Sequence, residues 1–259
     1  MRDSGLDEAI RAVGGVTELA RRIGISQPSV SNWQRIPADR VALVEKATGV
    51  AREILRPDLY GEGELAAGEI DEADSARANE YALLAALLVR APNAQLLNRL
   101  SQLRGDASPL GVVHAALAEA AAATTEQKVE REFFDLFIGL GRGELLPYGS
   151  YYLTGFLHER PLARLREDLR ALGIQRADGV FEPEDHAAIL CEIMAGLINR
   201  QLGADPDSDR VLFEKHMSPW IGRFFTDLER AESATFYRVV GTLGRVFVEI
   251  ETEAFALPS

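Results

Sequence analysis

The chain has 259 residues, 47% of them hydrophobic and 26% charged, which suits two globular domains with hydrophobic cores. The formal net charge of −12 is uneven, because residues 1–60 hold nine basic and eight acidic residues while the rest is strongly acidic. A large acidic region disfavours nucleic acid as its partner and favours a basic peptide. One cysteine, Cys191, excludes an internal disulfide, and no two of the four histidines have metal-ligand spacing, so we expect no metal and no cofactor.

The N-terminal residues and the apolar runs bear on the membrane question. Met1–Glu8 is polar, and no apolar segment of the signal-peptide type follows it. The longest apolar run, Tyr81–Val89, is about half the length that spans a bilayer. We therefore expect a cytoplasmic protein with no membrane insertion.

Residues 16–35, VTELARRIGISQPSVSNWQR, meet the requirements of a helix-turn-helix. Ala20 is the small residue where the two helices cross, and Gly24 permits a left-handed turn. Ser26 is expected to cap the second helix, with Pro28 in its first turn. Apolar residues that pin the second helix to the first follow at fixed offsets: Leu19, Ile23, Ile25, Val30 and Trp33.

With its continuation IPADRVALVEKATGVAREILRPDLY at 36–60, this segment resembles the YdaS/Cro-like helix-turn-helix family over roughly residues 5–60. The resemblance implies a DNA-binding fold whose second helix enters the major groove. Gln27 and Asn32 would then pair with adenine. Phosphate contacts would come from Ser29, Arg35 and Arg40. The near-neutral charge leaves open a folded module that has lost DNA binding and serves for docking or dimerisation.

Residues 61–76, GEGELAAGEIDEADSA, hold three glycines and six acidic residues but no basic one. This composition predicts a solvated linker between domains at 1–60 and 77–259. An acidic strip that shields the DNA-reading surface is the alternative.

Beyond the linker, apolar positions recur with the period of an α-helix, and strand-like alternation is missing. Helices are predicted over residues 80–90, 129–140, 161–172 and 233–255. Ser233 is expected to cap the last of them. The predicted fold class is therefore all-α.

Residues 131–152, REFFDLFIGLGRGELLPYGSYY, resemble a characteristic run of the TorD/DmsD/NarJ-type chaperones of molybdoenzyme maturation, E-[FY]-x-x-L-F-x-G-P-G-x(4)-P-P-Y-x-S-x-Y. Leu140 and Leu146 replace two prolines of that pattern. The matching positions are Glu132, Phe133, Leu136, Phe137, Gly139, Gly141, Pro147, Tyr148, Ser150 and Tyr152.

Two later segments extend the resemblance over about 180 residues. Residues 181–198 match the family's EPEDH hinge and helix start, through Glu182, Pro183, Glu184, Asp185, His186 and Met194. Residues 213–243 match its late aromatic segment, through His216, Trp220, Phe224, Phe236 and Tyr237. The family fold implies an all-helical, two-lobed TorD-like domain, with lobes at about 77–180 and 184–255 and a hinge at 181–186.

The hinge residues admit two interpretations. Pro183 suits the first position of a helix, and Glu184 and Asp185 complement its positive end, so their role could be confined to starting that helix. Alternatively, Glu182, Glu184 and Asp185, with His186 beside them, form an anionic edge that binds a basic leader peptide.

Aromatic residues would complete such a binding site. Tyr148, Tyr152 and Trp220, with Ser150 between the two tyrosines, would form a groove for the apolar stretch that follows the paired arginines of a twin-arginine leader. Core packing is the alternative for both tyrosines.

Catalysis is not expected. Ser150, Asp185 and His186 supply the residue types of a hydrolase triad, but adjacent Asp and His side chains are poorly placed for the orienting hydrogen bond. No nucleophile-elbow pattern surrounds Ser150, and GLGRG at 139–143 follows a helix, unlike a phosphate-binding loop.

The resemblance implies a non-enzymatic chaperone. It would bind the twin-arginine leader and the apo-form of a molybdopterin oxidoreductase catalytic subunit, formate dehydrogenase-like for example, before cofactor insertion and export. A transcription regulator with the TorD-like domain as its sensor is the alternative, and a third hypothesis joins the two, with the idle chaperone binding DNA. A homodimer is compatible with both domain types.

Overall fold

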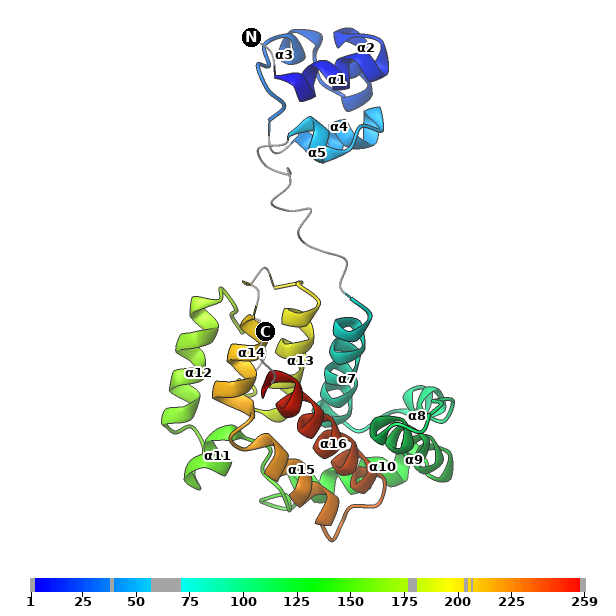
Figure 1. Cartoon of the computed structure of the whole chain (residues 1–259), viewed down its shortest axis with the longest axis vertical. Helices are drawn as coiled ribbons and strands as arrows, with labels where there is room; N and C mark the ends of the chain where they lie inside the picture. Colours follow the sequence, from blue (N-terminus) through cyan, green and yellow to red (C-terminus); the bar gives the residue numbers. More distant parts are fainter. Residues whose placement is uncertain are drawn as a thin grey trace. The chain divides into compact units, whose positions relative to one another are not determined.

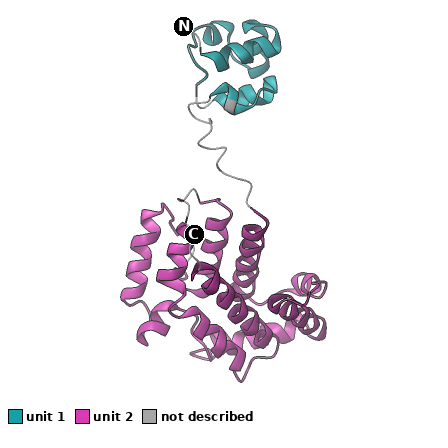
Figure 2. Cartoon of the chain, in the orientation of Figure 1, with its two compact units in different colours: residues 1–69 teal, residues 70–259 magenta. Residues whose placement is uncertain are grey.

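The computed structural model describes residues 3–37, 40–56, 71–176, 181–202, 205 and 207–256. The chain divides into two compact units, residues 1–69 and 70–259 (Figure 2). Within the described residues every regular element is a helix, which confirms the predicted all-α fold class. None of these helices is long and apolar enough to cross a membrane. Residues 61–70 of the predicted linker lie outside the described residues. Its last residues, 72–76, belong to a helix that begins at Glu72.

The smaller unit is a bundle of short helices around one core (Figure 1). They are α1 (Ser4–Val13), α2 (Val16–Ile23), α3 (Gln27–Ser31), α4 (Val41–Thr48) and α5 (Arg52–Leu55). Leu19, Ala20, Ile23 and Val30 are buried in the core, with Ile25 and Trp33 packed against it. The predicted contacts between the two helices of the helix-turn-helix are thus confirmed.

The turn between α2 and α3 has the predicted left-handed residue, since Gly24 has a φ of 71°. Ser26 is the N-cap of α3, but its hydroxyl bonds Ser29 Oγ at 2.7 Å rather than a backbone N–H. α3 spans five residues and Asn32 is its C-cap. Asn32, which is among the residues expected to read DNA, therefore lies at the end of the second helix.

The larger unit contains the remaining helices (Figure 1). They are α7 (Glu72–Val89), α8 (Ala94–Leu100), α9 (Pro109–Ala123), α10 (Glu126–Phe133), α11 (Gly149–Thr154), α12 (Arg160–Ala171), α13 (Ala187–Ile198), α14 (Ser208–Leu212), α15 (Ile221–Arg230) and α16 (Phe236–Ala256). Two π-helical turns, η2 (Phe134–Ile138) and η3 (Phe213–Met217), extend α10 and α14. Such turns occur frequently at functional sites, and both lie within segments that resemble the chaperone family.

One hydrophobic core runs through the whole larger unit. α13, which follows the predicted hinge, packs along α7, and α16 packs on both α9 and α15. Tyr81 of α7 makes an edge-to-face contact with Phe247 of α16, with ring centroids 4.7 Å apart. The two predicted lobes therefore share a core instead of forming separate ones.

The start of α16 corrects one sequence prediction. The helix begins at Phe236, and Ser233 is not its cap. The buried carboxylate of Glu132, about 100 residues earlier, accepts hydrogen bonds from the backbone N–H groups of Thr235, Phe236 and Tyr237 at 2.7–3.1 Å. A helix start leaves N–H groups without partners, and here a side chain from α10 satisfies them.

Candidate functional site

The two motif segments, 147–152 and 181–187, are joined by their backbones. Gly149 N donates to Asp185 O at 2.9 Å, and Ala187 N donates to Pro147 O at 2.8 Å. Tyr148 and His186 therefore face each other as an antiparallel bridge pair. The pairing places the starts of α11 and α13 side by side.

Asp185 holds the start of α11. Its Oδ2 accepts a hydrogen bond from Ser150 N at 2.7 Å, which satisfies a free N–H at the positive end of that helix. The side chain is 3% exposed, and its Oδ1 has no hydrogen-bond partner within the described part of the chain. A buried carboxylate oxygen without a partner is costly, so this atom needs an explanation.

His186 performs the same task for its own helix. It is the N-cap of α13, and its Nδ1 accepts a hydrogen bond from Ala188 N at 3.1 Å. Burial lowers the pKa of His186, against the opposing influence of the Glu182 and Asp185 carboxylates. An Nδ1 that accepts a hydrogen bond belongs to a neutral ring, which agrees with that direction. The predicted helix start at Pro183 is corrected to Ala187, because Pro183, Glu184 and Asp185 form a turn before it.

The hinge carboxylates point to different neighbours. Glu182 is exposed and accepts a hydrogen bond from the Tyr148 hydroxyl at 2.5 Å. Burial and this carboxylate raise the pKa of Tyr148. Glu184 pairs with Arg166 of α12 at 2.8 Å. Burial of Glu184 acts to raise the pKa of its carboxyl group, but the pairing with Arg166 outweighs burial, so this pKa is lowered. The three carboxylates therefore do not form one continuous anionic edge.

Tyr152 and Trp220 belong to an aromatic cluster rather than an open groove. Trp220 is buried, and its Nε1 donates to His216 O at 2.7 Å. Half-buried Tyr152 lies against Trp220, with centroids 5.5 Å apart, and its hydroxyl donates to Asp227 at 3.1 Å. Burial raises the pKa of Tyr152, followed by the effect of Asp227. Gly149 packs closely on this cluster, because a Cβ there would lie 3.0 Å from Trp220 Nε1 and the indole ring would have to shift.

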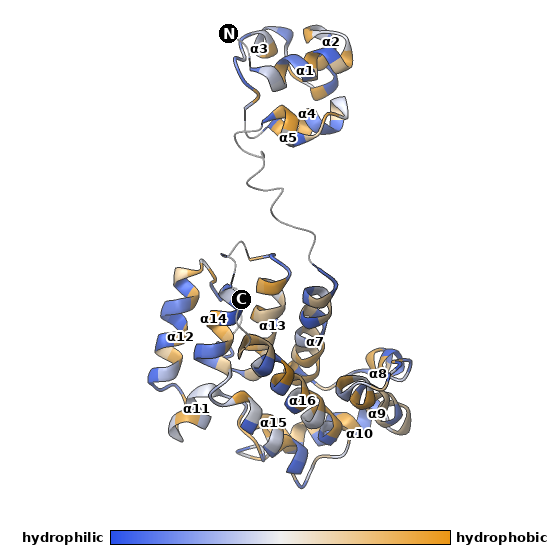
Figure 3. Ribbon diagram, in the orientation of Figure 1, coloured by the Kyte–Doolittle hydropathy of each residue, from blue (hydrophilic) through white to orange (hydrophobic). Residues whose placement is uncertain are grey.

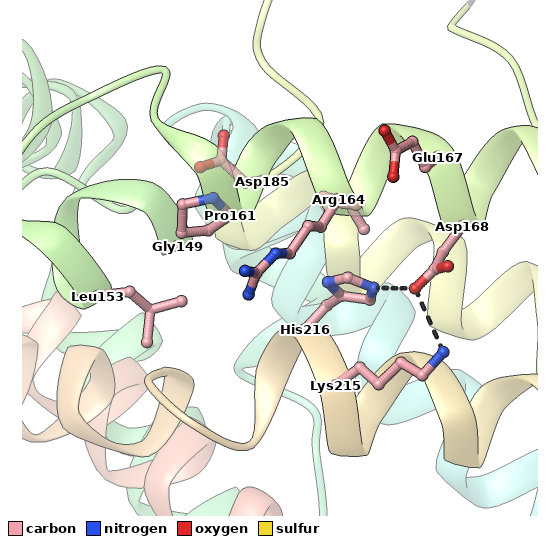
Figure 4. Close-up of a pocket in the computed structure, with 10 residues that line it drawn as sticks. Gly149, Leu153, Pro161, Arg164, Glu167, Asp168, Asp185, Lys215 and His216 are labelled. Carbon is pink, nitrogen blue, oxygen red and sulfur yellow. Dashed lines mark hydrogen bonds and ion pairs between the residues drawn. The ribbon is translucent and has the colours of Figure 1, made fainter.

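A cavity of about 430 Å³ opens beside Asp185, between α11, α12 and η3 (Figure 4). Three carboxylates and two cations line it with His216: Asp185, Glu167, Asp168, Arg164 and Lys215. Of these residues, Asp185 was predicted as a site residue and His216 only as a match to the family pattern, whereas Arg164, Glu167, Asp168 and Lys215 were missed. The one available signal was the one-turn spacing of Arg164, Glu167 and Asp168 on the predicted helix 161–172, which does not reveal the neighbouring η3.

The charges of the cavity are partly neutralised. His216 Nε2 lies 2.8 Å from Asp168 Oδ2, and Lys215 Nζ lies 3.5 Å from the same oxygen. The contact with His216 is the main reason that the pKa of Asp168 is lowered. Arg164 extends its guanidinium into the cavity (Figure 4) and makes no ion pair within the described residues. Asp185 and Glu167 are the lining carboxylates that form no ion pair within the described residues.

Exposed apolar residues adjoin the cavity along the chain. Leu153 lines its wall and is 43% exposed. Phe156 and Leu157 follow directly after α11, with exposures of 69% and 40%. Leu153, Phe156 and Leu157 thus place three exposed apolar side chains within five residues, and the first of them lines the cavity.

The triad residue types do not form a triad. Ser150 is buried, and its Oγ accepts a hydrogen bond from His158 N at 3.2 Å. Asp185 bonds the backbone of Ser150, and His186 bonds the backbone of Ala188. All three side chains thus support local structure.

The polar residues assigned to DNA reading lie on the surface of the smaller unit. Gln27, Ser29, Asn32 and Arg35 are exposed. Gln27 donates to Ser31 Oγ at 2.8 Å, and Arg35 pairs with Asp3 at 3.0 Å. Arg40 directly precedes α4 and also has an interaction partner.

Comparison with known proteins finds a similar family for each unit. Residues 103–226 match the model of the nitrate reductase delta subunit family, and residues 6–64 match that of the bacterial toxin YdaS family. Both resemblances seen in the sequence are confirmed. The larger unit is TorD-like and the smaller unit is YdaS-like.

Curated relatives agree for the TorD-like unit. The chain is 28% identical over 127 residues to the chaperone protein TorD of Vibrio cholerae (El Tor Inaba), covering 46% of this chain and 58% of that protein. It is 24% identical over 139 residues to the chaperone protein TorD of Vibrio atlanticus, covering 50% and 65%. With the chaperone protein TorD of Vibrio vulnificus (YJ016), it shares 35% identity over 78 residues, or 29% and 36%. The chain thus spans about three fifths of the length of the first two relatives.

Proposed function

We propose that the chain is a cytoplasmic maturation chaperone for a molybdopterin oxidoreductase. It would bind the twin-arginine leader and the apo-form of the catalytic subunit, for example of a formate dehydrogenase-like enzyme, until the cofactor is inserted. The similarity to proteins named chaperone protein TorD supports the class of function. Differential affinity for the unfinished client would drive binding and release, with no chemical step.

The observation that carries this proposal is a cavity in which Asp185 and Glu167 form no ion pair with the described residues, and whose wall includes the exposed apolar side chain of Leu153. A twin-arginine leader has paired arginines followed by an apolar stretch. Its guanidinium groups suit Asp185 and Glu167, and its apolar stretch suits Leu153 and Phe156. Arg164 now supplies the positive charge in the cavity, and an incoming arginine would replace it.

Peptide binding to the full chain tests the proposal. The probe is a fluorescent peptide with paired arginines and an apolar stretch, followed by anisotropy. Asp185→Asn keeps an acceptor for Ser150 N but removes the charge, and we expect about tenfold weaker binding. Arg164→Gln removes the competing cation and should tighten binding severalfold.

Arg160→Gln provides the control, because Arg160 is an exposed arginine at the start of α12 outside the cavity lining. Its affinity should equal that of the unmodified chain. Equal affinity for all three variants, or no measurable binding, would reject this site as the leader site. Binding that depends only on Leu153 and Phe156 would reject the charge recognition.

DNA binding by the YdaS-like unit is a second candidate function. Gln27, Ser29 and Asn32 lie exposed at α3, where their side chains can contact base edges. Arg21 and Arg22 pair with Glu18, so few basic groups remain for phosphates. A gel shift with the upstream region of the chain's own operon tests this function, and the absence of a shift at low salt would reject it.

A further inference from the structure

α13 is apolar along almost its whole length (Figure 3), with Glu192 as its one charged residue. One side packs along α7 in the core. On another side, Ile189, Ile193 and Gly196 follow each other at spacings of four and three residues, which places them in one stripe. Ile189 and Gly196 remain partly exposed. A helix that is apolar all round is normally covered completely, but the described residues bury Ile193 and leave part of Ile189 and Gly196 exposed.

The stripe forms the floor of a groove of about 510 Å³ between α12 and α13. Leu169 of α12, Ile174 and Leu202 complete its apolar lining. Gln175 and Gln201 lie at the same groove and offer amide groups to a peptide backbone. The volume falls within the range of about 300–1,000 Å³ that ligand pockets occupy.

The rim of the groove is basic. Residues 160–176 carry five arginines and two carboxylates, in a chain with a net charge of −12. Arg166, Arg170 and Arg176 line the groove, and Arg166 is paired with Glu184. Arg170 and Arg176 are exposed and form no ion pair or side-chain hydrogen bond within the described part of the chain. Glu192, also exposed, is the one lining carboxylate outside the Arg166 pair.

We propose that this groove is a second docking site, for a peptide segment whose apolar side chains are flanked by carboxylates. The apolar side chains would cover Ile189 and Ile193, and the carboxylates would pair with Arg170 and Arg176. The occupant has the opposite charge to a basic leader, because the groove offers two unpaired arginines and the cavity beside Asp185 offers carboxylates. α12 separates the two, since its residues 164, 165, 167 and 168 line the cavity and 166, 169 and 170 line the groove.

This arrangement lets one chain bind two chemically different segments of a client at once. Linked contacts raise the apparent affinity of both sites when the two segments belong to one protein. The groove stands independently of the leader site, because none of its lining residues lines the cavity.

The probe is a fluorescently labelled, end-capped peptide in which pairs of leucines alternate with pairs of glutamates. Its fluorescence anisotropy is measured as the full chain is added. The matched probe has lysine in place of every glutamate. We expect the glutamate peptide to bind and the lysine peptide to bind at least about tenfold more weakly. The double variant Arg170→Glu, Arg176→Glu should weaken the glutamate peptide by about tenfold or more and leave the leader-type peptide unaffected.

Arg160→Glu reverses one exposed charge on α12, the helix that carries Arg170, and as the control for a charge reversal outside the groove it should not change binding. Leu202→Ser removes part of the apolar lining at a side chain that is 38% exposed, and it should weaken the peptide without unfolding the unit. Equal binding of both peptides, or equal affinity of the double variant and the control, would overturn the proposal. The proposal would also be overturned if the chain self-associates, does not bind the peptide, and loses its self-association in the double variant. That outcome would assign the groove to a second copy of the chain.

Discussion

The two units use the polar residues of their motifs in opposite ways. In the TorD-like unit, Asp185 and His186 are buried, and each accepts a hydrogen bond from a backbone N–H at a helix start. In the YdaS-like unit, Gln27, Ser29 and Asn32 are exposed, and within the described residues the side chains of Gln27 and Ser29 bond only to other side chains. Motif residues that satisfy backbone groups stabilise the fold, whereas exposed ones depend on a partner for their role.

The largest effect should come from Glu132, a motif residue that bonds three backbone N–H groups at the start of α16. Glu132→Ala leaves these buried donors without an acceptor, and each such group costs about 1–3 kcal/mol. We expect the free energy of unfolding of the TorD-like unit to fall by about 3 kcal/mol or more. Urea unfolding followed by Trp220 fluorescence, in a Trp33→Phe background, measures this unit alone.

Glu130→Ala is the matched control, because Glu130 lies on the same helix and is exposed. Its free energy of unfolding should change by about 0.5 kcal/mol at most. If Glu132→Ala costs no more than this control, the role of Glu132 as the cap of α16 is wrong.

A smaller effect is expected at the turn of the YdaS-like unit. Gly24 has a φ of 71°, and a side chain in this left-handed conformation costs about 1–2 kcal/mol. Gly24→Ala should speed the hydrogen exchange of α2 and α3 amides by about tenfold. Gly222→Ala serves as the comparison, because Gly222 lies inside α15 without a left-handed φ and a Cβ there meets Val248 at an ordinary 3.7 Å. Unchanged exchange in the Gly24 variant would contradict the turn geometry.

The next effect concerns pH and His186. Burial lowers the pKa of His186 in the folded state, so the unfolded chain binds the proton more tightly. The stabilisation by the neutral ring is complete above the unfolded pKa of about 6.5 and is lost as the pH falls toward the folded pKa. Protonation also removes the Nδ1 acceptor of the α13 cap, which is worth about 1 kcal/mol.

His186→Asn tests this dependence, since asparagine can cap the helix but does not titrate. The unmodified chain should lose stability relative to the variant as the pH falls from 7 toward 5, so any advantage in the free energy of unfolding that it has at pH 7 should shrink. His114 gives the opposite sign: its hydrogen bond with Glu80 raises its pKa, so its contribution is present at low pH and is lost as the pH rises through the folded pKa. A pH-independent difference for His186→Asn would show that the ring is not held neutral.

The sequence predicted the features of the fold that depend on neighbouring residues, and it missed a feature that depends on a contact between distant residues. The helix-turn-helix followed from local rules, because Ala20, Gly24 and Val30 act within one short segment. The helix predicted at 161–172 was right to within one residue of α12. The cap of α16 could not be predicted, because its acceptor, Glu132, comes from a distant helix.

The candidate site was predicted in part for the same reason. The motifs correctly brought the segments around Tyr148 and Asp185 together, and the structure joins them through their backbones. The sequence does not show to which side of α12 each hinge carboxylate turns. Glu184 and Asp185 were therefore predicted to belong to one anionic edge. Arg164 and Asp168 were missed, because nothing local indicates that η3 lies opposite them.

The smallest effect on stability, and the sharpest test of the comparison, lies at α3. Gln27→Ala combined with Asn32→Ala removes exposed side chains that bond no backbone group, so the free energy of unfolding should change by about 0.5 kcal/mol or less. If the unit binds DNA, each lost base contact costs about 1–3 kcal/mol of affinity, and the double variant should lose its gel shift. Gln34→Ala, an exposed glutamine outside α3, should leave the shift unchanged. A large loss of stability in the double variant would remove the contrast between the units, because these polar residues would then support the fold as Asp185 and His186 do.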